Sequence, residues 1–300
     1  VFGTVYDRFM DSGLYDRLVE RQLLIPHEEI AEGQVPSARD CHKIIKPKRI
    51  PYVSYPYEWS FSQLKAAALL TLKTTNEALK ADFMLRDASG FNVQFLGSKP
   101  VFIDTLSFAP YTEGAPWVAY RQFCQHFLAP LALMAYTDVD LSKLLCSQID
   151  GIPLPLASKL LPRRTRFSPF LAMHVHVHAK MQQGHANAGK AGDSAQIEKT
   201  SVPRKRLAAM IRSLADGIAK MRWDMPATEW GDYYDNTSYT DRAGEEKRKL
   251  VGELLSSIAE PLRLGHDLGA NTGEFSRIAA RYCDWVVSLD IDPVAVERNY

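Results

Sequence analysis

The feature that most constrains the fold is the run over 262–292, LRLGHDLGANTGEFSRIAARYCDWVVSLDID. Its hydrophobic pattern predicts, in order, a strand, a tight glycine loop, a helix and a second strand, at 262–268, 269–273, 274–282 and 285–289. Gly269 and Gly273 let the backbone turn sharply and approach a ligand without a Cβ in the way. The run therefore predicts an α/β unit with a ligand-binding loop after its first strand.

The polar residues around this loop point to a nucleotide-like ligand. Asp290 follows the second predicted strand. In a doubly wound sheet, a carboxylate at this position faces the ribose of a nucleotide-like ligand and can accept hydrogen bonds from both of its hydroxyl groups. The predicted helix offers free backbone N–H groups to a carboxylate or phosphate. Dinucleotide folds share this design, but here Asp267 precedes the first glycine by two residues and Asn271 replaces the middle glycine. Both details disfavour a dinucleotide; an ordinary βαβ unit with a chance aspartate is the other alternative.

The run D-L-G-x-N-T-G-E-F-S followed by V-V-x-L-D-I-D-P resembles the first two S-adenosylmethionine (SAM) binding motifs of class I SAM-dependent methyltransferases, over about 233–300. The resemblance implies a Rossmann-like SAM-binding domain, with SAM as cofactor. Its loop, including Ala270 and Asn271, would lie along the methionine part of SAM. Asp267 would support the loop and the ligand's ammonium group, Asp290 would hold the ribose, and Ile291 would pack by the adenine.

An aromatic stretch, WGDYYDNTSY over 230–239, precedes the first of these strands. In this superfamily such stretches often cap the SAM pocket, which would make Tyr234 or Tyr239 cofactor neighbours. A packed cluster of aromatic residues between domains explains the composition equally well.

The middle of the chain, LRDASGFNVQFLGSKPVFID over 85–104, resembles the C-lobe of the kinase and aminoglycoside-phosphotransferase superfamily. Asp87 and Asn92 have the spacing of the kinase catalytic loop, and Asp104 follows across a predicted hairpin of 92–96 and 101–104. The resemblance implies Mg-ATP, with Asp87 receiving the substrate proton and the other two holding the metal. Leu85 replaces the usual histidine, and Thr105-Leu106 replaces Phe-Gly.

A turn-capping role is the alternative for these three residues, because Asp and Asn commonly cap turns. The two roles differ in geometry. A kinase-like site requires the three side chains to converge near enough to share one Mg²⁺, whereas capping bonds each side chain to its own local backbone.

Other polar clusters give weaker signals. His174, His176 and His178 would share one face of a strand, but their flanks favour a helix, and we expect no metal site there. The basic runs at 163–166 and 204–206 are most simply solvated charge, with anion binding as the alternative.

Three hundred residues suit two domains. We expect an α+β module at 1–182, with helices over 61–79 and 117–135, the latter interrupted at Pro130. A polar linker follows at 183–205, and the Rossmann-like domain occupies 206–300. The 36 basic and 35 acidic residues give no electrostatic argument for a nucleic-acid partner, and no apolar run is long enough to span a membrane. The four dispersed cysteines favour reduced thiols and a cytoplasmic protein.

The chain begins at Val1 and stops at Tyr300 inside the predicted fold, so we expect an incomplete domain whose fragment alone is inactive. The expected function of the intact protein is SAM-dependent methyl transfer to an unknown acceptor. The alternatives are a kinase-like phosphotransferase or ATP-binding pseudoenzyme joined to a SAM-binding domain, and a non-enzymatic module that binds a carrier or protein.

Overall fold

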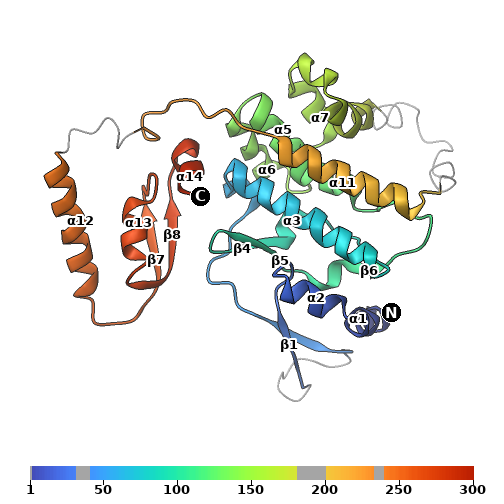
Figure 1. Cartoon of the computed structure of the whole chain (residues 1–300), viewed down its shortest axis with the longest axis horizontal. Helices are drawn as coiled ribbons and strands as arrows, with labels where there is room; N and C mark the ends of the chain where they lie inside the picture. The colour runs from blue at the N-terminus through green and yellow to red at the C-terminus, as the bar shows by residue number, and fades with distance from the viewer. Residues whose placement is uncertain (1, 32–40, 181–200, 233–239) are drawn as a thin grey trace. The chain divides into compact units, whose positions relative to one another are not determined.

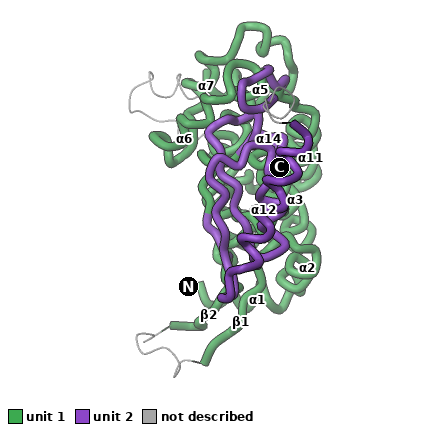
Figure 2. Tube along the Cα trace, turned by 90° about the vertical axis from the view of Figure 1, so that its left-hand side faces the viewer, with its two compact units in different colours: residues 1–50, 54–59, 63–223 green, residues 51–53, 60–62, 224–300 purple. Residues whose placement is uncertain are grey.

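A computed structural model of the chain describes residues 2–31, 41–180, 201–232 and 240–300, and combines helices with small sheets (Figure 1). This mixture agrees with the expected α/β class in its broad sense. Two compact units make up the chain (Figure 2). Unit 1 comprises Val1–Ile50, Ser54–Trp59 and Gln63–Trp223, and unit 2 comprises Pro51–Val53, Ser60–Ser62 and Asp224–Tyr300.

The first half of unit 1 contains three antiparallel strand pairs, β1–β2, β3–β6 and β4–β5. Their bounds are β1 His27–Ile30, β2 Ile44–Pro47, β3 Phe83–Leu85, β4 Val93–Leu96, β5 Lys99–Phe102 and β6 Phe108–Pro110. The β4–β5 pair confirms the predicted hairpin. Its turn is only Gly97-Ser98, since Lys99 already pairs with Leu96, and the positive φ of Gly97 (63°) is one that glycine adopts without strain.

The helices of unit 1 include the one predicted over 61–79, which runs one residue further as α3 (Phe61–Lys80). Pro130 does not interrupt the helix predicted over 117–135. It lies in the first turn of α5, where the missing N–H of proline is tolerated. A π-helical turn at Cys124–Leu128 joins α5 to α4. The helices are α1 Phe2–Asp11, α2 Leu14–Glu20, α3, α4 Tyr120–Phe123, α5 Ala129–Tyr136, α6 Leu144–Ser147, α7 Leu154–Leu160, α8 Pro169–Leu171 and α11 Arg204–Lys220.

Helix α11 belongs to unit 1, whereas the sequence analysis assigned 206–300 to the C-terminal domain. The reason is its apolar face, which is buried within unit 1 through Leu207, Ile211, Leu214 and Ile218. Lys65 of α3 also donates to the carbonyls of Ala219 and Met221 at the end of α11. The boundary between units therefore follows Trp223. The predicted linker lies largely at 181–200, outside the described residues.

Aromatic side chains form the core of unit 1. The rings of Phe9 and Phe108 stack with centroids 4.7 Å apart, and Phe83 and Phe102 pack edge-on against this pair. All four are at most 2% exposed. This core fixes the strands on either side of Asp87, Asn92 and Asp104.

Unit 2 is a βαβ arrangement preceded and followed by a helix. Its elements are α12 Asp241–Ser256, β7 Leu262–Leu268, α13 Glu274–Ala279, β8 Cys283–Leu289 and α14 Pro293–Asn299. Strands β7 and β8 are parallel, with Leu262 opposite Cys283 and Leu268 opposite Leu289. The predicted strand–loop–helix–strand order is confirmed. The carboxyl ends of both strands, and hence the loop after β7 and Asp290 after β8, lie at one edge of the sheet.

Within the described residues, no helix has the length and apolar content needed to cross a membrane.

Candidate functional site

The loop after β7 is held against the end of β8 by its own backbone. The N–H groups of Gly269 and Ala270 both donate to the carbonyl of Leu289, at 2.8 and 3.0 Å. Gly269, Asn271 and Gly273 have positive φ angles of 73°, 51° and 79°. Glycine and asparagine are the residues that adopt this region most readily. The loop therefore makes its turn with residues that tolerate these backbone angles.

Asp290 lies where this loop meets the end of β8. Its Oδ2 accepts the N–H of Asn271 at 2.7 Å, and its Oδ1 accepts the N–H of Asp292 at 2.9 Å. A carboxylate oxygen has two lone pairs, so each oxygen can take a further donor such as a ribose hydroxyl. The backbone bonds fix the carboxylate in place before any ligand arrives.

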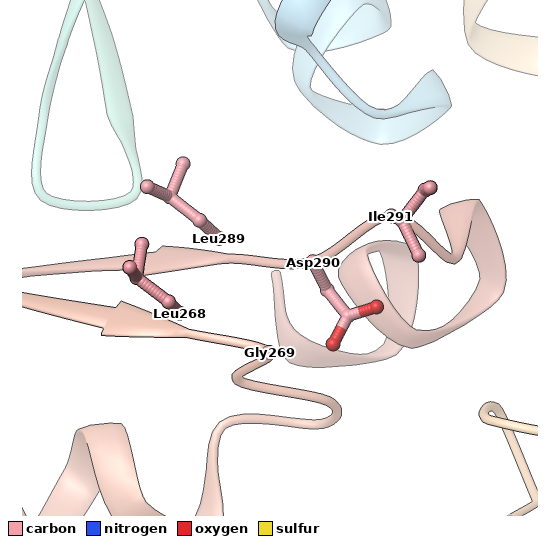
Figure 3. A pocket seen from close by; sticks show the side chains of 5 residues that line it. All are labelled: Leu268, Gly269, Leu289, Asp290 and Ile291. Carbon is pink, nitrogen blue, oxygen red and sulfur yellow. The ribbon is translucent and has the colours of Figure 1, made fainter.

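A shallow hollow of about 400 Å³ lies beside Asp290 and is lined by Leu268, Gly269, Leu289, Asp290 and Ile291 (Figure 3). Leu268 and Leu289 project to one side of the strand pair, and the Asp290 carboxylate projects to the other. The side chains of Leu268 and Ile291 are 76% and 89% exposed. The exposed Ile291, next to Asp290 in the chain, suits a ligand with both an apolar and a hydroxyl-bearing part.

The two glycines of the loop have different surroundings. A Cβ on Gly269 would meet no atom within 4 Å, so its backbone is open to solvent beside the hollow. A Cβ on Gly273 would lie 1.9 Å from the side chain of Asn299 on α14. Both glycines were expected to let the backbone approach the ligand, which stays a prediction. At Gly273 the positive φ of 79° favours glycine, whereas the end of the Asn299 side chain could move to admit a Cβ.

Asp267 faces α13. Its Oδ2 accepts the hydroxyl of Ser276 at 2.6 Å, and Ser288 of β8 donates to the same Ser276 hydroxyl at 2.7 Å. These bonds join β7, α13 and β8 below the loop, which agrees with the predicted support of the loop. A contact of Asp267 with a ligand ammonium group stays a prediction. Helix α13 has only six residues, so the site depends on the loop backbone and Asp290.

Sequence reasoning missed the bonds that attach the segment before α12 to this loop. The amide Nδ2 of Asn271 donates to the carbonyl of Trp230, and Arg298 of α14 pairs with Asp232 at 2.8 Å. The sequence feature that could have indicated these bonds is Asn271, which stands where the dinucleotide-binding motif has its middle glycine. The residues expected as cofactor neighbours, Tyr234 and Tyr239, lie outside the described residues.

In unit 1, the structure brings two of the three kinase-like candidates together. The amide of Asn92 donates to Ser107 Oγ at 3.3 Å, and Ser107 donates to Asp104 Oδ2 at 2.5 Å. One hydroxyl thus joins both side chains. Asp104 Oδ1 also caps a 3₁₀ turn by accepting the N–H of Leu106 at 2.9 Å. Asp104 therefore combines the two expected roles, capping and convergence, and the sequence analysis did not identify Ser107.

Asp87 is held by its own neighbourhood. Its Oδ1 accepts the backbone N–H of Ser89 and the amide Nε2 of Gln122, both at 2.9 Å, while Gln122 Oε1 accepts the N–H of Ala88 at 2.8 Å. Gln122 of α4 thus fixes both the carboxylate and the following backbone. Burial lowers the pKa of the adjacent His126, against the charge of Asp87, which raises it.

Two of the three histidines expected on one helix, His174 and His176, are buried and hydrogen-bonded. Tyr120 bonds to His174 Nδ1 at 2.7 Å, and Ser158 and Thr165 bond to the two ring nitrogens of His176 at 2.8 and 2.9 Å. Burial lowers the pKa of His174 to about 4. In the part of the chain that the structure describes, no group of three His, Cys, Asp or Glu side chains is arranged to hold a metal ion.

The basic runs lie on exposed surface or in ion pairs. Arg163, Arg164 and Arg166 lie in a short 3₁₀ segment, whereas Arg204 pairs with Asp82 and, at 3.8 Å, with Glu113, and lies over the ring of Tyr111. The carboxylates around Arg204 already neutralise the positive charge that a bound anion would need.

No family model matches the chain, and no solved structure matches it. The chain is similar to the nodulation protein NoeA of Rhizobium meliloti (strain 1021), with 34% identity over 260 residues. The matched region covers 86% of this chain and 54% of NoeA, so the chain spans about half the length of this relative.

Proposed function

We propose that unit 2 binds SAM and that the intact protein transfers its methyl group to an acceptor. The observation that carries this proposal is Asp290, a carboxylate fixed by two backbone N–H groups at the end of β8, beside an open glycine loop. This is the arrangement a parallel α/β unit needs in order to bind the ribose of a nucleoside.

The described residues fit the parts of this cofactor. The open backbone at Gly269 leaves room for the methionine part, and the Asp290 oxygens can accept the two ribose hydroxyls. The exposed Ile291 offers apolar surface to the adenine ring. A dinucleotide would share the ribose contact, but the acidic Asp267, bonded to Ser276 beneath the loop, departs from the small or apolar residue of dinucleotide sites.

When bound, SAM supplies an electrophilic methyl group on a sulfonium. The contribution of the chain is to hold the cofactor in one orientation, because in-line placement of the nucleophile and the methyl group accounts for most of the rate. The rigid loop and the fixed Asp290 carboxylate serve that purpose.

The test is Asp290→Ala in the intact natural protein, with SAM affinity measured by calorimetry. We expect a loss of about 1–3 kcal/mol, because two ribose hydroxyls lose their acceptors. Asp284→Ala is the matched control, since Asp284 is an exposed aspartate near the other end of the same strand. Unchanged SAM affinity in Asp290→Ala would refute the ribose assignment.

Gly269 provides a second test. Gly269→Val should abolish SAM binding, because the side chain would enter open space beside the hollow and would also strain a φ of 73°. Gly97→Val controls for strain, since Gly97 has a similar φ of 63° and open space in the β4–β5 turn of unit 1. If both variants bind SAM alike, the loop does not approach the ligand.

A second candidate function, binding of Mg-ATP by unit 1, is favoured by the convergence of Asn92 and Asp104 on Ser107. Oxygen ligands of this kind suit Mg²⁺, and Asp87 lies nearby in sequence with its carboxylate fixed by Gln122. Because Asp87 bonds to Ser89 and Gln122 and is not joined to the other two side chains, this observation supports Mg-ATP binding and does not extend to phosphate transfer.

Calorimetry with Mg-ATP tests this candidate. Asp104→Asn should weaken binding at least tenfold. Asp138→Asn is the control, because Asp138 also caps a 3₁₀ turn in unit 1, by accepting the N–H of Asp140 at 2.9 Å. Absence of Mg-ATP binding by the wild-type protein would leave Asp87, Asn92 and Asp104 with structural roles.

The similarity to NoeA supports a connection with nodulation for the intact protein. We therefore propose that the methyl acceptor is a molecule used in that process. Its chemical class is the open question for an acceptor screen with the purified protein.

A further inference from the structure

Asn271 makes an unusual set of bonds for a loop residue. It is 8% exposed, with a left-handed φ of 51°, and it bonds in three directions. Its N–H donates to Asp290, its Oδ1 accepts the N–H of Thr272 at 2.7 Å, and its Nδ2 donates to the carbonyl of Trp230. Glycine would adopt this φ with less strain, so the side chain contributes through its bonds.

The segment that Asn271 contacts, residues 228–232, is fastened at its other points to the start and end of α14. Thr228 bonds to the Asp292 carboxylate that caps α14, and the N–H of Gly231 donates to Thr228 Oγ1 at 3.0 Å. Arg298 bonds to the carbonyl of Gly231 and pairs with Asp232. A Cβ on Gly231 would lie 2.8 Å from Val294, which shows how closely the 228–232 segment packs on α14. The 228–232 segment is therefore held in place on α14 within unit 2.

The bonds of Asn271 join this segment to the carboxylate assigned to the ribose. Any movement of the Asp290 carboxylate is transmitted to the backbone of Asn271, and from its side chain to the carbonyl of Trp230. The Trp230 ring is 47% exposed, so its environment reports on the placement of the segment.

We propose that Asn271 is a positioning residue of the SAM site, which sets the Asp290 carboxylate and the 228–232 segment in one fixed arrangement. The inference rests on the proposed SAM binding. Asn271 acts through its neighbours: the backbone N–H orients Asp290, and the side-chain amide holds Trp230. Cofactor binding at Asp290 and the placement of the 228–232 segment are then coupled.

The experiment compares Asn271→Gly and Asn271→Asp in the intact natural protein. Asn271→Gly keeps the positive φ and the backbone bond to Asp290 but loses both side-chain bonds. Asn271→Asp keeps the acceptor for Thr272 and loses the donor to Trp230. Thr272→Ala, a side-chain truncation in the same loop, is the control. We expect Asn271→Asp, which loses one hydrogen bond, to bind SAM about tenfold more weakly, which corresponds to about 1.4 kcal/mol, and Asn271→Gly, which loses two, to bind at least as weakly.

A spectroscopic readout separates positioning from simple stability. Wild-type protein should show a SAM-dependent change in tryptophan emission that Trp230→Phe lacks, and Asn271→Gly should lose that change. A variant with a lower melting temperature but wild-type SAM affinity and emission change would have lost only a structural bond, and this overturns the proposal.

The Asp290→Ala variant distinguishes the two levels of failure. If Asp290→Ala weakens SAM binding and Asn271→Gly does not, the positioning role is wrong while the proposed function stands. If the wild type binds no SAM, both are wrong.

Discussion

The two units differ most in how they bury apolar surface. Unit 1 has a dry aromatic core in which Phe83, Phe102 and Phe108 are at most 1% exposed. In the described residues of 224–300, the buried apolar side chains are Ala270, Val294 and Ala295. Helix α12 has no buried residue, although it contains Leu250 and Leu254, which are more than half exposed.

This difference indicates two sources of order. Burial of large apolar side chains contributes about 1.5–3 kcal/mol each, and unit 1 has many of them. Around the loop of unit 2, order comes instead from polar bonds that Asp267, Asn271, Asp290 and Asp292 make with each other and with their neighbours. Polar bonds contribute about 1 kcal/mol each. We therefore expect unit 2 to be the less stable and the more responsive to a ligand.

The largest expected effect is a contrast between the same substitution in the two units. Leu72→Ala on α3 removes a side chain that is 1% exposed and should cost about 2–5 kcal/mol. Leu254→Ala on α12, which is 58% exposed, should change the free energy of unfolding by less than about 0.5 kcal/mol. Urea denaturation measures both. Equal losses of stability would show that the apolar face of α12 is buried against a surface outside unit 2.

Acid should destabilise unit 1 through its histidines. The pKa of His174 is lowered to about 4 by burial, below its ordinary value of 6.5, so the folded state favours the neutral ring. Its contribution to stability is therefore fully present above pH 6.5 and is lost as the pH falls towards 4, by at most about 3 kcal/mol. Urea midpoints between pH 7 and pH 4 measure this loss.

His174→Gln tests the assignment, because glutamine does not titrate in this range. The variant should be less stable at pH 7 and should lose less stability on acidification than the wild type. His266→Gln, at an exposed histidine on β7 of unit 2, is the comparison. An unchanged pH slope in His174→Gln would place the acid sensitivity on the other histidines whose pKa values burial lowers, which are His27, His126, His176 and His178.

SAM should stabilise unit 2 and leave unit 1 unchanged. A ligand at one hundred times its Kd stabilises the state that binds it by about 2.7 kcal/mol. Hydrogen exchange in the intact natural protein, followed by mass spectrometry, should slow in peptides from 262–292 and stay constant in peptides from α3 and α5. Slower exchange in both units would mean that they form one cooperative unit.

The sequence predicted the backbone of unit 2 closely because glycines and β-branched runs are local signals. The strand 262–268 matches β7, and the loop and Asp290 lie where the pattern placed them. The shorter helix α13, which ends at Ala279 instead of residue 282, reflects weak periodicity at its last turn. The contact between Gly273 and the Asn299 side chain joins residues 26 apart, and no local pattern contains it.

Contacts between distant residues also explain what was missed in unit 1. Ser107 and Gln122 complete the candidate site from later elements, and neither has a spacing that points to Asp104 or Asp87. The assignment of α11 failed because an amphipathic helix does not specify which core it covers. Pro130 was expected to break a helix, since the preceding π-helical turn cannot be read from the sequence.

The smallest expected effect compares one capping aspartate in each unit. Asp292 caps α14 and is 7% exposed. Burial raises the pKa of its carboxyl group. Hydrogen bonds to the carboxylate have the larger effect and lower the pKa overall; they come from Thr228 and from the N–H groups of Val294, Ala295 and Gly231. A lowered carboxyl pKa gives stability that is present above the ordinary value of 3.8 and lost as the pH falls below it. Asp292→Ala should therefore cost about 1 kcal/mol at pH 7, and less in acid.

Asp138→Ala, at the exposed cap in unit 1, should cost less at pH 7, because Asp138 caps only a short 3₁₀ turn. Hydrogen exchange in peptides covering α14 and the 3₁₀ turn at Val139–Lys143 measures each cost locally. If Asp292→Ala leaves exchange in α14 unchanged, the polar bonds around the loop are not what orders unit 2.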